Sequence, residues 1–159
     1  MHVLSDGRRK LGAVLALLLS ALLMAGVGPL TADANAEERY GRRRQMLGLT
    51  NEDRTARDRR ELNFAAALSK YAKSHSEAMA REGYLFHSSQ DQLRAVLNGY
   101  DWSIAGENVG VGGSLESLED AFMESRLHRE NILRREFARA AVGIVREEGR
   151  LWVTVIFYG

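Results

Sequence analysis

The chain has 159 residues, a formal net charge of +1 and no cysteine. Its composition, 45% hydrophobic and 27% charged, is typical of a globular protein and argues against disorder. The absence of cysteine excludes disulfide bonds, cysteine-based catalysis and thiolate metal ligands. The length suits one domain, or one domain preceded by a removable leader.

The N-terminus has the pattern of a cleavable signal peptide. A basic segment at residues 8–10 precedes an apolar run at residues 11–27, and Ala34-Asn35-Ala36 has the small-x-small pattern of a cleavage site. The apolar run just reaches the lower limit for crossing a bilayer, so a permanent membrane anchor is the alternative. The Ala-Asn-Ala end and the acidic Glu37-Glu38 that follow it favour cleavage. We therefore predict a signal peptide over 1–36 and a domain over 37–159. The protein is then secreted or held in the cell envelope, with no stable membrane span after cleavage.

The predicted domain is nearly neutral, because the leader holds three of the 22 basic and two of the 21 acidic residues. A neutral domain is not expected to attract nucleic acid through general electrostatics. The compact basic run at residues 42–44 is interpreted as a solvated helix face.

The first half of the domain predicts two helices. Residues 38–54 form the first, and residues 63–82 form the stronger one, because their apolar side chains recur at steps of three and four. Asn63 is the expected N-cap and Gly83 the C-cap of this second helix. His75 lies on its apolar stripe, where it is interpreted as a hydrogen-bonded core residue rather than a ligand.

The second half alternates short helices and strands, and helices followed by strands predict a sheet covered by helices. We expect a helix over 91–98 and a strand over 102–111, with a flexible glycine-rich loop over 110–113. A helix capped by Ser114 should reach about residue 127, and a turn with a helical piece should follow over 128–137. The apolar runs 141–145 and 151–158 predict a β-hairpin.

Three residues could carry chemistry. His87 and His128 lie at element boundaries, where side chains can face a binding site. Glu107 lies in an apolar, glycine-rich extended segment, where burying a carboxylate is costly unless it is paired. It is either a surface carboxylate at a strand edge, which spacing alone favours, or an inward carboxylate that meets both histidines.

Two segments resemble the bacterial branch of the CAP superfamily: Gly106-Glu107-Asn108-Val109 and the stretch from Phe122 to Leu133. This superfamily comprises cysteine-rich secretory proteins, antigen 5 and pathogenesis-related proteins, and its module is also called the SCP domain. The upstream helices, the segment ending at His87 and the terminal strands follow the same order, so the resemblance covers nearly all of the predicted domain. It implies an α+β fold, a three-layer α-β-α sandwich with an antiparallel sheet flanked by helices and a central cleft.

The resemblance also implies a site. In many members two histidines and two acidic residues line the cleft, and some members bind a divalent metal there. His87, Glu107 and His128 match three of these positions. Phe122 replaces the family's usual tryptophan, and counting from it puts Ser125 at the fourth position with Glu124 as its neighbour. The expected cleft residues are His87, Glu107, Asn108, Glu124, Ser125 and His128, and the expected metal ligands are His87, Glu107 and His128.

Two imidazoles and a carboxylate suit zinc, with water completing its coordination. They could equally form a metal-free hydrogen-bond cluster, which is slightly favoured. In such a cluster the glutamate would fix the tautomer of one imidazole and raise its affinity for a proton.

Two functions remain open at this stage, and no catalytic residue is assigned. The resemblance implies a secreted, non-enzymatic binding or interaction module whose extracellular ligand is a lipid, a cell-envelope component or a protein. The alternative is a peptidase or esterase in which a metal-bound or Glu107-activated water attacks the substrate. A Ser-His-Glu triad lacks support, since the sequence has no Gly-x-Ser-x-Gly elbow.

Overall fold

The structure is a computed structural model that describes residues 30–159, with the side chains of residues 35–159. Its internal contacts divide the chain into two units, 1–38 and 39–159, and the second unit holds the sheet and the candidate site. The predicted signal peptide lies mostly outside the described residues, and its last residues fall in helix α1 (Leu30–Thr55). Within residues 30–159 no helix combines the length and apolarity that a bilayer span requires.

A four-stranded sheet forms the centre of the second unit, in the order β1-β3-β4-β2. Its strands are β1 (Asn63–Phe64), β2 (Ala105–Gly112), β3 (Arg139–Glu147) and β4 (Arg150–Tyr158). Strands β2 and β3 both pair antiparallel with β4, and only the two-residue β1 runs parallel to its neighbour β3. The sheet is therefore mainly antiparallel, as the resemblance implied.

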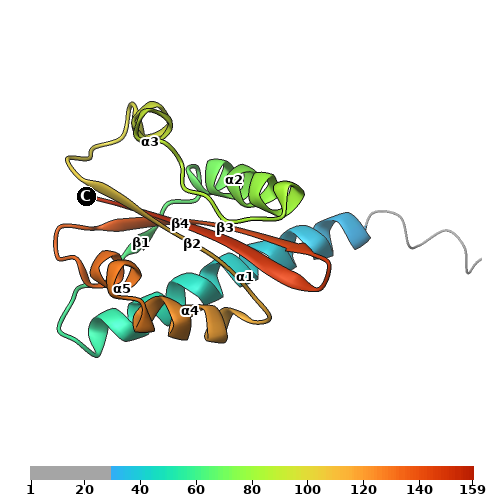
Figure 1. The fold of residues 1–159 in the computed structure, drawn as a ribbon, viewed down its shortest axis with the longest axis horizontal. Coiled ribbons are helices and arrows are strands. Elements are labelled where there is room, and N and C mark those ends of the chain that lie inside the picture. The colour runs from blue at the N-terminus through green and yellow to red at the C-terminus, as the bar shows by residue number, and fades with distance from the viewer. Residues whose placement is uncertain (1–29) are drawn as a thin grey trace, which may run out of the picture. The chain divides into compact units, whose positions relative to one another are not determined.

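Helices cover both faces of this sheet (Figure 1). Helix α2 (Ser69–Glu82) packs on β3 and β4 from one side, where α3 (Gln90–Leu97) also lies. Helices α4 (Leu115–Glu124) and α5 (Arg126–Leu133) pack on β2 from the other side, together with α1. The unit is a three-layer α-β-α sandwich, which confirms the predicted fold class.

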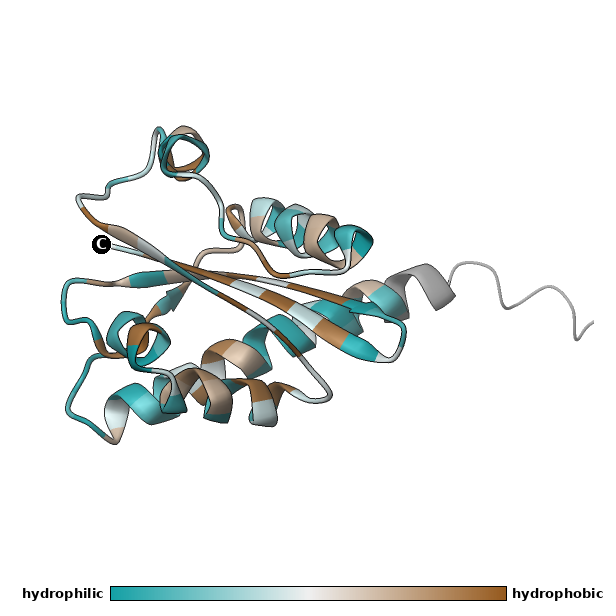
Figure 2. Ribbon diagram, in the orientation of Figure 1, coloured by the Kyte–Doolittle hydropathy of each residue, from teal (hydrophilic) through white to brown (hydrophobic). Residues whose placement is uncertain are grey.

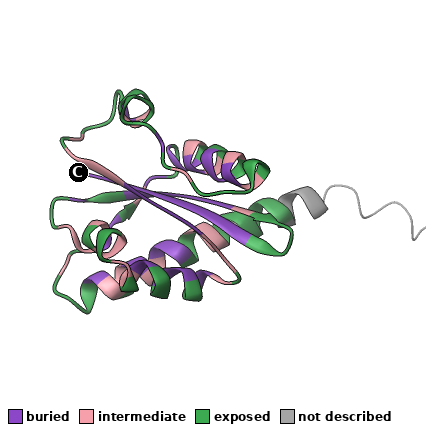
Figure 3. Ribbon diagram, viewed as in Figure 1, coloured by how far each residue is buried: buried purple, intermediate pink, exposed green. Residues whose placement is uncertain are grey.

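The core lies between these layers. Hydrophobic residues concentrate on the central strands (Figure 2), and every residue of β4 after Arg150 is buried (Figure 3). Met46 and Leu47 of α1 join Leu118 and Phe122 of α4 in the largest apolar cluster. A helix on each face thus removes both sides of the sheet from water, which is the main favourable contribution to folding.

The C-terminal β-hairpin is confirmed. Its two-residue turn consists of Glu148 and Gly149, with φ values of 48° and 76°. Positive φ at both positions matches the right-handed twist of the flanking strands, and glycine adopts it without steric cost.

The predicted start of the second helix is wrong. Asn63 and Phe64 form β1, and α2 begins only at Ser69. The backbone N–H groups of Asn63 and Ala65 donate to carbonyls of residues 138 and 140 at 2.9 and 2.8 Å, so pairing with β3 replaces the helical bonds. The predicted end is confirmed, because Gly83 has φ 78° and its N–H donates to the carbonyl of Met79.

Two further expectations need correction on the opposite face. The helix capped by Ser114 ends at Glu124, because Ser125 is extended (φ −77°, ψ 120°) and a new helix, α5, begins at Arg126. Residues 110–112 are not a flexible rim but belong to β2. A Cβ on Gly110 would lie 2.9 Å from the Phe122 ring, so this glycine lets α4 pack closely on the strand.

Candidate functional site

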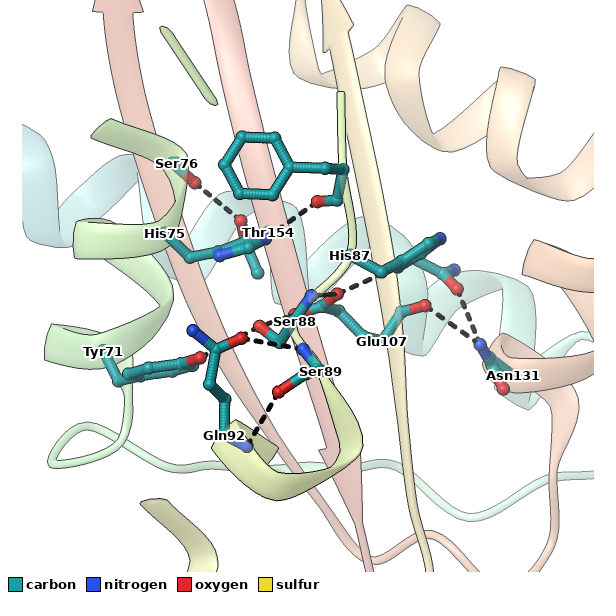
Figure 4. Close-up of polar contacts among 12 residues, drawn as sticks. Tyr71, His75, Ser76, His87, Ser88, Ser89, Gln92, Glu107, Asn131 and Thr154 are labelled. Atoms are coloured by element: carbon teal, nitrogen blue, oxygen red, sulfur yellow. Dashed lines mark hydrogen bonds and ion pairs between the residues drawn. The ribbon is translucent and has the colours of Figure 1, made fainter. Parts of the chain in front are cut away.

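The carboxylate of Glu107 is the centre of the candidate site. Its side chain is 3% exposed. Oε1 accepts hydrogen bonds from His87 Nδ1 and from the backbone N–H of Ser88, both at 2.9 Å, and Oε2 accepts from the Ser88 hydroxyl at 2.7 Å (Figure 4). The surface interpretation favoured by spacing is therefore wrong: Glu107 points inward and bonds His87, whereas a contact with His128 stays a prediction. Its burial is compensated by three donors.

The connection between α2 and α3 supplies these donors, and neighbouring side chains hold it in place. The Tyr71 hydroxyl donates to the Ser88 hydroxyl at 3.0 Å. His75 Nε2 bonds the carbonyl of Phe86 at 2.9 Å, which confirms His75 as a hydrogen-bonded core residue. Ser89 caps α3 through a reciprocal pair of bonds with Gln92. Contacts on both sides of His87 and Ser88 thus fix them against β2.

The His87 ring is held at one end and open at the other. Its side chain is 57% exposed, and its Nδ1 contacts a carboxylate oxygen, which can only accept. Nδ1 therefore carries a proton, and in the neutral ring Nε2 is an acceptor. A ligand that reaches this ring from solvent can donate an N–H or O–H to Nε2.

His128 lies on α5 and approaches the same region. Its ring meets the edge of Phe122 at a centroid distance of 5.0 Å. Burial lowers the pKa of His128, and the charge of His87 lowers it further. A positive charge on His87 therefore opposes protonation of His128.

The arrangement of His87, Glu107 and His128 tests whether these residues could hold the predicted zinc ion. In the part of the chain that the structure describes, no three His, Asp or Glu side chains form a group that could hold a metal ion. Each oxygen of Glu107 already accepts from protein donors. In this arrangement the residues fit a hydrogen-bond cluster better than a metal centre, and zinc stays a prediction of the resemblance.

Asn108 connects β2 to α5. This fully buried side chain donates to the carbonyl of His128 at 3.1 Å and accepts from Asn131 Nδ2 at 2.9 Å. Asn131 also donates to the carbonyl of Glu107 at 3.3 Å. The two amides therefore fix the helix that carries His128 relative to the strand that carries Glu107.

The two candidates for the fourth position lie at the junction of α4 and α5. Glu124 is exposed and lines a hollow with residues that include Asp53, Asp120 and Arg129. Ser125 is half-buried, and its backbone carbonyl accepts from the N–H of Arg129 at 2.9 Å. Neither side chain is among the described groups that donate hydrogen bonds to the Glu107 carboxylate.

Ser88, Tyr71 and Asn131 belong to the site, although they are not among the expected cleft residues. Ser88 contributes two of the three hydrogen bonds to Glu107. The available signal was its position directly after His87, together with the requirement that a buried carboxylate find several donors. Nothing in the sequence around Tyr71 distinguishes it from a core aromatic residue.

Glu107→Gln is expected to lower the free energy of unfolding by about 1–3 kcal/mol, because an amide nitrogen cannot accept the bonds that a carboxylate oxygen accepts. Urea denaturation followed by circular dichroism measures this. Glu124→Gln removes the same charge from an exposed position and should change stability by less than about 0.5 kcal/mol. Equal effects of the two variants would show that the bonds to Glu107 contribute nothing net.

Comparison with known proteins places this chain in a family. Residues 47–157 match the CAP family, described as the cysteine-rich secretory protein family. An uncharacterized protein of Bacillus subtilis, YkwD, is 32% identical over 116 residues, which is 69% of this chain and 44% of that protein. The chain thus spans less than half the length of this relative.

Solved structures share the fold. An extracellular SCP-domain protein from Bacillus anthracis aligns with a TM-score of 0.66 and 27% identity, covering 82% of this chain and 44% of the other. A cysteine-rich secretory protein from Staphylococcus aureus aligns with a TM-score of 0.64 and 21% identity, covering 77% and 39%. The latter likeness concerns the fold alone.

The α-β-α sandwich is the fold of an SCP-type domain, and its edge strand β2 carries the histidine-bonded Glu107. The match extends over most of the described residues. The chain belongs to the CAP family, although it has none of the cysteines that give the family its name.

Proposed function

We propose that this CAP-family protein is exported, to the cell surface or beyond, and acts there as a non-enzymatic binding module. Its ligand contacts the site formed by His87, Glu107 and His128. The predicted signal peptide supports export, and so does its similarity to the B. anthracis protein described as extracellular.

The observation that carries this proposal is that both oxygens of the Glu107 carboxylate are buried and hydrogen-bonded within the chain. Its Oε1 accepts two hydrogen bonds and its Oε2 accepts one, all from the chain itself. A general base must reach the proton that it removes, directly or through one water. A carboxylate that is 3% exposed and bonded at both oxygens orients His87 rather than activating water.

The exposed ring of His87 decides what the ligand offers. Since Nε2 accepts in the neutral ring, the matching group is a hydroxyl or amide N–H donor. Lipids with hydroxylated headgroups, glycan or peptide components of the cell envelope, and proteins all provide such donors.

The experiment is a binding and turnover screen on one preparation of the purified protein. The probes are a fluorescent monoacylglycerol, soluble peptidoglycan fragments and phosphatidylglycerol vesicles, with a peptide library and a p-nitrophenyl ester as turnover substrates. We expect saturable binding of one probe, weakened at least tenfold in His87→Ala and unchanged in Arg81→Ala, an exposed control, with no product formed. Product formation that disappears in both His87→Ala and Glu107→Gln would contradict the proposal and establish the hydrolase.

Metal content separates the two functions further. Zinc measured after dialysis is expected below one equivalent, and equally so in the wild type and in His87→Ala. One equivalent of zinc retained by the wild type and lost from His87→Ala would favour the metal-assisted hydrolase.

A further inference from the structure

A second polar site lies on the other helical layer, between α1 and α4. It is a hollow of about 320 Å³. Its walls carry five carboxyl groups: Glu52 and Asp53 from α1, and Glu116, Glu119 and Asp120 from α4. Neither His87 nor Glu107 lines it, so it is separate from the site described above.

Glu119 differs from the other four acidic residues of this hollow because its carboxyl group is buried. Its side chain lies in the protein interior, since the residue is 3% exposed. Oε2 accepts a hydrogen bond from the Thr50 hydroxyl at 3.1 Å, but the equally buried Oε1 has no hydrogen-bond partner. Buried polar atoms in native proteins nearly always have a partner. Because Glu119 is one of the residues that line the hollow, its unpartnered oxygen indicates a missing donor there.

The surrounding charges favour a positive donor. Asp53 and Asp120 are the neighbours whose charges act on Glu119, while Glu52 and Glu116 are exposed on the rim. Within the hollow's surroundings, Arg57 bonds Asp53 at 2.5 Å and Gln45 donates to Glu116 at 2.7 Å. Among the described residues, five carboxyl groups and no basic side chain line this hollow, while Arg57 and Arg129 line the neighbouring hollow that shares Asp53 and Asp120.

The protonation of Glu119 agrees with this picture. Burial raises its pKa to about 7, the Thr50 hydrogen bond opposes the rise, and Asp53 and Asp120 add to it. A cation in the hollow would reverse the electrostatic contribution and favour the ionised carboxylate. Binding would then release a proton from Glu119 near neutral pH.

The spacing of the carboxyl groups selects the kind of cation. No three acidic or histidine side chains of the described residues converge closely enough to hold a metal ion. A single point charge cannot reach groups that are spread over two helices, whereas a chain of amines can. We propose that the hollow between α1 and α4 binds an organic cation with two or more separated ammonium groups, with Glu119 as the innermost anion and Asp53 and Asp120 at the rim.

Titration calorimetry of the purified protein with spermidine, at constant ionic strength, tests the proposal. We expect saturable binding at pH 8 and about tenfold weaker binding at pH 6, because Glu119 must ionise and its pKa is about 7. Repeating the titration in buffers with different ionisation enthalpies should show proton release at pH 7.

Glu119→Gln should abolish the saturable binding and the pH dependence. Glu77→Gln is the matched control, because it removes the same charge from an exposed position on α2. Asp120→Asn, an exposed rim substitution, should weaken binding several-fold and serves as the second test if Glu119→Gln does not fold.

Two results would overturn the inference. One is spermidine binding that Glu77→Gln weakens as much as Glu119→Gln and Asp120→Asn do, which would show only a general attraction to negative charge. The other is calcium binding that depends on Glu119 and is tighter than spermidine binding, which would assign the hollow to a metal ion.

Discussion

Gly143→Ala is expected to lower the free energy of unfolding by about 3 kcal/mol or more, and to prevent folding if α2 cannot move. A Cβ at this position of β3 would lie 2.1 Å from the carbonyl carbon of Ala72 and 2.3 Å from the backbone nitrogen of Lys73. These are backbone atoms of α2, so no side-chain rotation relieves the clash. The helix would have to move off the sheet.

That displacement would also break bonds around Gly143. The Ser76 hydroxyl donates to the carbonyl of Gly143 at 3.2 Å, and the N–H of Val142 donates to the Ser69 hydroxyl at 3.1 Å. Both serines are fully buried, so their lost partners would not be replaced by water. Urea denaturation followed by circular dichroism measures the effect.

Gly48→Ala is the matched control. Gly48 lies inside α1, where an added Cβ meets nothing within 4 Å. Alanine there should stabilise the protein by about 0.5–1 kcal/mol, because glycine is the poorer helix former. If Gly143→Ala changes stability as little as Gly48→Ala, the close contact between α2 and β3 is not present in solution.

Arg54→Met should have the second large effect, a loss of about 3 kcal/mol or more. The side chain is 1% exposed, although arginine is rarely buried completely. Its Nε donates to the carbonyl of Arg60 at 2.7 Å, and Nη1 donates to those of Ile132 and Arg134 at 2.6 and 3.0 Å. Methionine fills similar space but leaves these carbonyls without donors.

The position of the charge explains why it is tolerated. Ile132 and Arg134 lie at the end of α5, where free carbonyls attract a cation. Burial, and then the charges of Arg59 and Arg60, lower the pKa of Arg54, so these carbonyl bonds must offset an unfavourable environment. The guanidinium connects the last turn of α1 to the last turn of α5.

Arg57→Met, compared in the same denaturation experiment, separates burial from charge. Arg57 is exposed and forms an ion pair with Asp53 four residues earlier. Exposed pairs of this kind contribute a few tenths of a kcal/mol. A loss for Arg54→Met as small as that for Arg57→Met would rule out a structural role for the buried guanidinium.

The sequence predicted most residues of the candidate site, but it did not predict their burial or their hydrogen bonds. The Gly-Glu-Asn segment pointed to Glu107, and the boundary position of His87 pointed to the histidine that it bonds. Spacing alone nevertheless favoured a surface position for Glu107, because the donors that compensate its burial come from residues 19 and 20 positions away. Asn108 was chosen as a cleft residue, yet its contacts hold α5 in place.

By itself, the sequence determined the features that neighbouring residues control. The apolar periodicity of α2, its glycine C-cap, the Ser114 cap of α4 and the tight hairpin turn each depend on residues within a few positions of one another. The packing together of distant segments decided the rest. Pairing with β3 drew Asn63 and Phe64 out of the predicted helix, and burial by remote segments of the chain fixed the environments of Arg54, Glu107 and Glu119. Whether a polar group is stable in a protein interior depends on the partners that surround it there, and those partners come from remote parts of the chain.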